Sequence, residues 1–82
     1  MNVFTLVRME NTKTQVDVKV LGTYKKQGDA MYDADWDIKM FKGKIINQTQ
    51  ERSENALALG YEFENGLKVE YRIIENEYHE DF

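Results

Sequence analysis

Few side chains in this sequence are suited to covalent or acid–base chemistry. The chain has one histidine, His79, one serine, Ser53, and no cysteine. A nucleophile, a general base and a group that orients the base therefore cannot be assembled from the usual residue types. The lack of cysteine also excludes disulfides and zinc sites built from thiolates. We expect a protein that is not an enzyme and carries no cofactor.

Metal-ligating residue types occur at two places. Asp33, Asp35 and Asp37 have the spacing that opens a calcium loop. Such a loop also needs Gly at its sixth position and Glu at its twelfth, where this chain has Ile38 and Lys44. The second place is the alternating acidic and imidazole set near the C-terminus: Glu75, Glu77, His79 and Asp81. A solvated acidic tail explains this set better, and we expect no metal site.

Charge is unevenly distributed along the chain. The net charge is −4, yet residues 51–82 alone hold nine acidic and three basic residues. Overall acidity argues against binding to duplex DNA or to anionic membranes. A groove for single-stranded nucleic acid would need lysines beside accessible aromatic rings. The candidates for it are Lys19, Tyr24, Lys25, Lys26, Lys39, Phe41, Lys42 and Lys44.

The sequence ends in Glu77–Tyr78–His79–Glu80–Asp81–Phe82. A short acidic segment with a terminal Phe resembles the protein-docking tip of single-stranded DNA-binding proteins. For this chain the resemblance implies a protein contact through the residues Glu77, Glu80, Asp81 and Phe82. The resemblance covers the six residues 77–82 and depends on their composition.

The elements that would position these residues are predicted from alternation. Val3, Thr5, Val7 and Met9 share one face of an extended segment, as do Val16, Val18 and Val20. Pairing Met9 with Val16 sets apolar residues together on one face and Arg8 against Asp17 on the other. Residues 30–40 also alternate, with Tyr32, Trp36 and Ile38 at even positions and three aspartates at odd ones. We therefore predict a third strand, in which Trp36 faces Val20 and Asp37 faces Lys19.

The final hairpin is predicted from its loop. A two-residue turn at Asn65–Gly66 would oppose Phe63 to Lys68 and so set an apolar face against charge. A three-residue loop, 64–66, opposes Phe63 to Leu67 and gives Gly66 the left-handed position that a type I turn with a bulge requires. We predict the three-residue loop.

Residues 41–56 leave two alternatives open. Residues 47–59 are rich in helix formers, and Gly60 could end a helix there. If they are helical, the order of elements is that of an OB barrel (βββαββ); if extended, the chain is an up-and-down meander. In both cases we expect a mainly β fold, a small antiparallel meander of five to six strands curled into a barrel or half-barrel. Residues 1–74 would form the domain and residues 75–82 an acidic tail.

One apolar group lies on the face that also carries charge. In the registers above, Phe4 falls opposite Leu21, with Leu6 beside them. Three grouped apolar side chains require either intramolecular cover, by residues 44–56 or the tail, or a partner protein. No segment is long and apolar enough for a membrane span, so we expect a cytoplasmic protein.

Together these features predict a small, acidic, non-enzymatic binding protein that acts through contacts with another protein or through self-association. An inhibitor or adaptor, of the type that phages and mobile elements encode, matches the size and charge. The contact residues would be Phe4, Leu6, Leu21 and the acidic tail. The alternative is a small OB-like protein that binds single-stranded nucleic acid and docks other proteins with its Phe-terminated tail.

Overall fold

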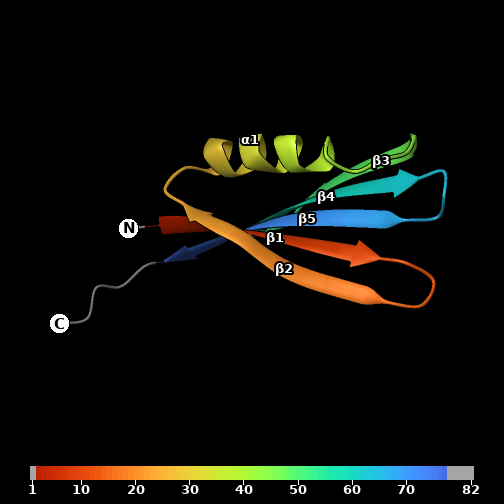
Figure 1. Cartoon of the computed structure of the whole chain (residues 1–82). Helices are drawn as coiled ribbons and strands as arrows, with labels where there is room; N and C mark the ends of the chain where they lie inside the picture. The colour runs from red at the N-terminus through yellow and green to blue at the C-terminus, as the bar shows by residue number, and fades with distance from the viewer. Residues whose placement is uncertain (1, 78–82) are drawn as a thin grey trace.

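The computed structural model describes residues 2–77 as one antiparallel sheet with a helix on one face (Figure 1). In chain order the elements are β1 (Asn2–Asn11), β2 (Val16–Tyr24), α1 (Gln27–Ile38), β3 (Ile45–Arg52), β4 (Ala56–Phe63) and β5 (Lys68–Glu77). The strands lie in the order β2-β1-β5-β4-β3. This arrangement confirms the mainly β, antiparallel fold with five strands. The sheet is open, with β2 and β3 at its two edges.

Two local units make up the sheet. The hairpin β1–β2 and the meander β3–β4–β5 meet where β1 pairs with β5, from Asn2 opposite Glu77 to Asn11 opposite Lys68. Helix α1 carries the chain from the edge at β2 towards the edge at β3. Strand β5 continues through Glu77, beyond the domain boundary expected at residue 74. In the described part of the chain, no helix is long and apolar enough to cross a membrane.

The predicted strand over residues 30–40 is wrong, because residues 30–38 belong to α1 and residues 39–40 to the turn that follows it. Its even positions fall into two sets, each with a spacing of four residues. Ala30, Ala34 and Ile38 form one set and are buried against the sheet. The other set is Tyr32, Trp36 and Met40, and it is exposed. A spacing of four gives one stripe on a helix, so two stripes on opposite sides produce the same alternation as a strand.

Packing, more than local sequence, holds α1 in place. The N-cap residue Lys26 makes no side-chain capping bond, and Asp29 is the acidic residue that favours the first turn. At the other end the N–H groups of Met40 and Phe41 donate to the carbonyls of Asp37 and Ile38, at 3.1 and 3.2 Å. These bonds join residues three apart, and they satisfy carbonyls that the end of an α-helix leaves without partners.

The core lies between α1 and the sheet. Its buried strand residues are Leu6, Leu57, Phe63, Val69, Tyr71 and Ile73. Phe4 and Leu21 are partly buried and pack against this cluster. The apolar group of Phe4, Leu6 and Leu21 is therefore covered from within the chain, which was one of the two alternatives. The cover is α1, however, and not residues 44–56.

The opposite face of the sheet carries the valines of β2. Val16, Val18 and Val20 are between 60% and 63% exposed, although their alternation predicted a core position. In the predicted register Met9 faced Val16, whereas it faces Val18 in the structure. Leu21 is an extra residue in β2, at the bulge between the Leu6–Gly22 and Val7–Val20 pairs. The pairing of β2 with residues 34–40 is likewise absent, and β2 is an edge.

Residues 47–59 lie in strands β3 and β4 and in the turn 53–55 between them. The order of elements is consequently ββαβββ, and the OB order does not occur. The final hairpin has the predicted three-residue loop: the Phe63 N–H donates to the Leu67 carbonyl at 2.8 Å, and Gly66 has a φ of +93°. Tyr61 accordingly pairs with Val69 and Leu59 with Tyr71, as a three-residue loop requires.

The face away from α1 is hollowed. A cavity of about 380 Å³ opens there, lined by residues from both edge strands, among them Val16 of β2 and Thr49 of β3. Charged side chains, Glu62, Lys68 and Glu70, also line it. The mixed lining points to a solvated depression in a strongly twisted sheet.

The assignment of the two faces is tested by truncating one residue on each. Leu6→Ala removes a fully buried side chain and should lower the free energy of unfolding by about 2–5 kcal/mol. Val18→Ala, at an exposed position, should change it by less than about 0.5 kcal/mol. Urea unfolding of both variants at low protein concentration measures the difference. A larger loss for Val18→Ala would reverse the assignment of core and surface.

Candidate functional site

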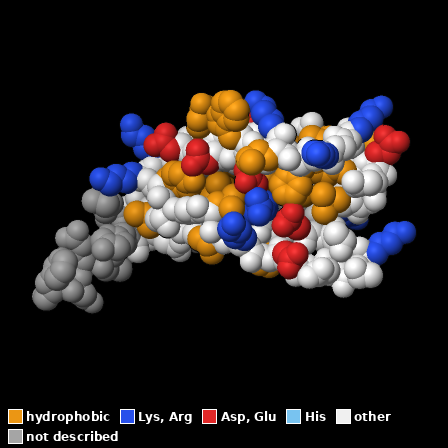
Figure 2. Space-filling model, in the orientation of Figure 1, with side chains coloured by type: hydrophobic (Ala, Val, Ile, Leu, Met, Phe, Trp, Pro, Cys, Tyr) orange, Lys and Arg blue, Asp and Glu red, His pale blue; other side chains and the backbone are white. Residues whose placement is uncertain are grey.

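The outer surface of α1 and the turn that follows it carry a row of large apolar side chains, here named the outer stripe: Tyr32, Trp36 and Met40. Their exposed fractions are 62%, 56% and 80%. Figure 2 shows orange side chains gathered over α1, with acidic ones beside them. Single exposed apolar residues are ordinary on a protein surface, but a Tyr–Trp–Met group is typical of a contact site.

The outer stripe has an ordered geometry. The rings of Tyr32 and Trp36 meet edge to face, with centroids 6.2 Å apart and planes at 67°. The ammonium nitrogen of Lys39 lies 5.3 Å from the centre of the Trp36 ring and 3.4 Å from an oxygen of Asp35. This arrangement limits the rotamers of Trp36 before any partner binds, which lowers the entropy lost on contact.

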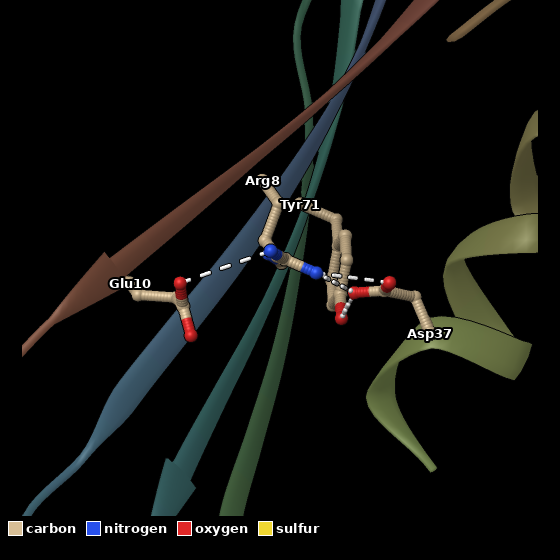
Figure 3. A network of polar contacts seen from close by, with 4 residues as sticks. All are labelled: Arg8, Glu10, Asp37 and Tyr71. Atoms are coloured by element: carbon tan, nitrogen blue, oxygen red, sulfur yellow. Dashed lines mark hydrogen bonds and ion pairs between the residues drawn. The ribbon is translucent and has the colours of Figure 1, made fainter. Parts of the chain in front are cut away.

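A polar network fixes α1 on the sheet (Figure 3). The guanidinium of Arg8 on β1 donates from Nη1 to both carboxylate oxygens of Asp37 on α1, at 2.8 and 2.9 Å. The hydroxyl of Tyr71 on β5 donates to Asp37 Oδ2 at 2.6 Å. Arg8 also lies 3.8 Å from Glu10 and 5.4 Å from the centre of the Phe41 ring. The network joins α1 to the central strand β5 and to its neighbour β1.

The protonation states of this network follow from its surroundings. Burial alone would lower the pKa of Arg8, but the hydrogen bonds and charge of Asp37 outweigh it and raise that pKa. Burial, together with the bond to Asp37, raises the pKa of Tyr71. At the helix edge, burial and the 2.5 Å bond to Asp33 raise the pKa of Tyr24 to about 12. Arg8 is therefore charged and both phenols are neutral at physiological pH.

The three aspartates with calcium-loop spacing go to three different partners. Asp33 accepts from Tyr24, Asp35 pairs with Lys39, and Asp37 binds Arg8. Within residues 2–77, no group of acidic or imidazole side chains is arranged to hold a metal ion.

The residues proposed for a nucleic-acid groove are not brought together. Lys25 and Lys26 precede α1, whereas Lys39, Lys42 and Lys44 follow it, so about 18 Å of helix separates the two groups. Phe41 packs on Phe63, Tyr24 is bound to Asp33, and Lys19 lies on the edge strand β2. The segment between the lysines is α1, whose charged residues are all acidic.

The predicted protein-contact residues are also dispersed. Leu6 has no exposed surface, and Phe4 and Leu21 pack on the core, so these three offer little to a partner. Glu77 ends β5, opposite Asn2. The remaining tail residues of the prediction, Glu80, Asp81 and Phe82, lie outside the described residues, as does His79.

The outer stripe was missed because the strand prediction turned Tyr32 and Trp36 towards the core. One signal could have found it: the residues are four apart, and Ala30, Ala34 and Ile38 repeat the same spacing two positions earlier. Comparison with protein-family models, with curated proteins and with solved structures gave no match.

The network at Asp37 predicts a difference between two aspartates on the same helix. Asp37→Ala leaves the partly buried Arg8 guanidinium and the Tyr71 hydroxyl without their acceptor, and should lower the free energy of unfolding by about 1–3 kcal/mol. Asp35→Ala removes an exposed ion pair and should change it by less than about 0.5 kcal/mol. Thermal and urea unfolding measure both. Equal losses would show that the network does not anchor α1.

The raised pKa of Tyr71 predicts a loss of stability in alkali. Because the folded state keeps this phenol neutral above its ordinary pKa of about 10, its contribution is complete below pH 10 and is lost as the pH rises further. Tyr71→Phe should therefore show a shallower fall in unfolding free energy between pH 9 and pH 11 than the wild type. Parallel curves for the two proteins would contradict this origin of the alkaline loss.

Proposed function

We propose that this protein is a small non-enzymatic binding protein, of the inhibitor or adaptor type, and that it docks a partner protein on the outer surface of α1. The observation that carries the proposal is the exposure of the outer stripe, with Tyr32 and Trp36 on α1 and Met40 in the turn after it. Trp and Tyr dominate the residues that contribute most to binding energy at protein interfaces.

Charge indicates the chemistry of the partner. The outer stripe is bordered by Asp29, Asp33 and Asp35, and the chain as a whole has a net charge of −4. Lys39 lies over the Trp36 ring and pairs with Asp35, so its positive charge is partly neutralised. We infer a partner surface with an apolar centre and a basic rim, because such a surface would be steered towards α1 and would pair with its aspartates.

Single-stranded nucleic acid is the second candidate, since an exposed Trp36 ring could stack on a base. The acidic rim opposes it, because phosphates would approach three aspartates. Titration with oligo-dT at low salt separates the two candidates. Quenching of Trp36 fluorescence that disappears as salt is raised would favour nucleic acid over protein.

The test of the protein contact uses Trp36→Ala and a matched control, Ile46→Ala, which removes another exposed apolar side chain, on β3. Partners are captured from a lysate of the producing cells by wild type and both variants, and then purified and titrated. Loss of a Trp at the centre of an interface should weaken binding by about 2 kcal/mol, roughly thirtyfold, whereas Ile46→Ala should bind as the wild type does.

Trp36 is the only tryptophan of the chain, so its emission reports the contact directly. Binding that covers the ring should shift the wild-type emission to shorter wavelength. The proposal is overturned if every captured protein binds the wild type and Trp36→Ala with equal affinity, or if Ile46→Ala is the variant that loses binding.

A further inference from the structure

Strand β2 has a free edge with a full set of backbone hydrogen-bonding groups. It is the first strand of the sheet and pairs with β1 on one side. The N–H of Thr12 donates to the carbonyl of Gln15 at 2.9 Å, and bonded pairs alternate along antiparallel strands. Asp17 and Lys19 are therefore the residues bonded to β1, and Val16, Val18 and Val20 direct their N–H and C=O groups outwards.

The side chains of this edge protect it only through two charges of opposite sign, Asp17 and Lys19. Edge strands are commonly blunted by proline, by charged side chains, by inward charge or by short length. β2 is nine residues long, the chain has no proline, and the three outward-bonding residues are exposed valines. The other edge differs, because β3 continues after Ile46 with the polar residues 47–52.

The charged residues of β2 lie opposite like charges on β1, the strand with which β2 pairs. Arg8 lies directly opposite Lys19, and Glu10 lies directly opposite Asp17. Like charges at directly opposed positions are destabilising. Within residues 2–77, neither Asp17 nor Lys19 takes part in an ion pair. Both charged residues of the edge therefore lack an opposite charge.

The segment Val16–Asp17–Val18–Lys19–Val20 is complementary to itself when reversed. In an antiparallel pair of two copies centred on Val18, Val18 meets Val18 of the second copy and Val16 meets Val20. Asp17 of each copy meets Lys19 of the other. A register shifted by two residues would oppose Asp17 to Asp17 or Lys19 to Lys19. A register shifted by one residue would place valines opposite charged residues.

We propose that this edge binds a second copy of the chain, so that two β2 strands pair antiparallel about a two-fold axis at Val18 and the two sheets become continuous. The outward N–H and C=O groups of Val16, Val18 and Val20 supply the hydrogen bonds in this register. Asp17 and Lys19 gain the opposite charges that β1 does not provide. The contact is isologous, and it closes after two copies.

The size of the contact sets the expected strength. One pair of nine-residue strands buries less surface than the roughly 1,200–2,000 Å² of a standard stable interface, so the dimer should be reversible. Sedimentation velocity and light scattering on the full chain, from low micromolar to about 1 mM, should show a monomer–dimer equilibrium with a micromolar dissociation constant.

Two charge reversals test the register. Asp17→Lys sets a lysine against Lys19 of the second copy at two symmetry-related positions, and Lys19→Asp likewise sets an aspartate against Asp17. Each variant alone should dimerise at least about tenfold more weakly. An equimolar mixture of the two should form a heterodimer with affinity close to that of the wild type, since opposite charges again meet.

Folding of these variants is not at risk in the way that a core substitution would be. Lys19→Asp places a carboxylate opposite Arg8, and Asp17→Lys places an ammonium opposite Glu10, so each monomer should be at least as stable as the wild type. Lys42→Asp and Asp29→Lys make the same changes in net charge away from β2, and should leave dimerisation unchanged.

A wild type that remains monomeric up to about 1 mM overturns the proposal. So does a dimer that both reversals leave intact, which would assign the contact to another surface, and so does a mixture that stays monomeric.

Discussion

Asp37 is the residue through which helix and sheet are joined. It accepts two hydrogen bonds from Arg8 on β1 and one from Tyr71 on β5, so one carboxylate ties α1 to the central strand and to its neighbour. Because Asp37 is fixed, the rotation of α1 about its axis is fixed as well. Ala30 and Ala34 then face the sheet, and Tyr32 and Trp36 face away. A rotation of one residue, about 100°, would break the network and bring larger side chains against the sheet.

The ion pair of Arg8 with Asp37 also explains why β1 and β2 do not pair in the register that was predicted from their opposite charges. Within the hairpin alone, Arg8 opposite Asp17 is the better arrangement, and the sequence predicted it. In the folded chain Arg8 already has its carboxylate, that of Asp37 near the end of α1, 29 residues later. The hairpin is then free to adopt the register set by the Thr12–Gln15 turn, with Arg8 opposite Lys19. A counter-charge distant in sequence therefore removed the charge preference that would have opposed this local pairing.

What could be predicted from the sequence was what neighbouring residues determine. The 64–66 loop is local, because Gly66 must adopt a positive φ and Phe63 must meet Leu67, and both features are confirmed. Strand β1 was located correctly, but its core face was not, since Phe4 and Leu6 required a helix to cover them. Helix α1 was not predicted, because its buried and exposed apolar stripes are two residues apart in sequence and together give the alternation of a strand. The outer stripe was lost by the same error.

One helix can cover only one face of a five-stranded sheet, and the consequences fall on β2. Its valines lie on the uncovered face and its backbone on a free edge, so apolar side chains and backbone hydrogen-bonding groups of the same strand are both open to a partner. Pairing about Val18 would place side chains of both copies on matching faces, because directly opposed residues share a face. Both α1 helices would then lie on the same side of the joined sheet, each with its outer stripe directed away from it. A partner with two suitable surfaces would engage the second stripe at a high effective concentration, so the edge contact would strengthen docking without touching the docked surface.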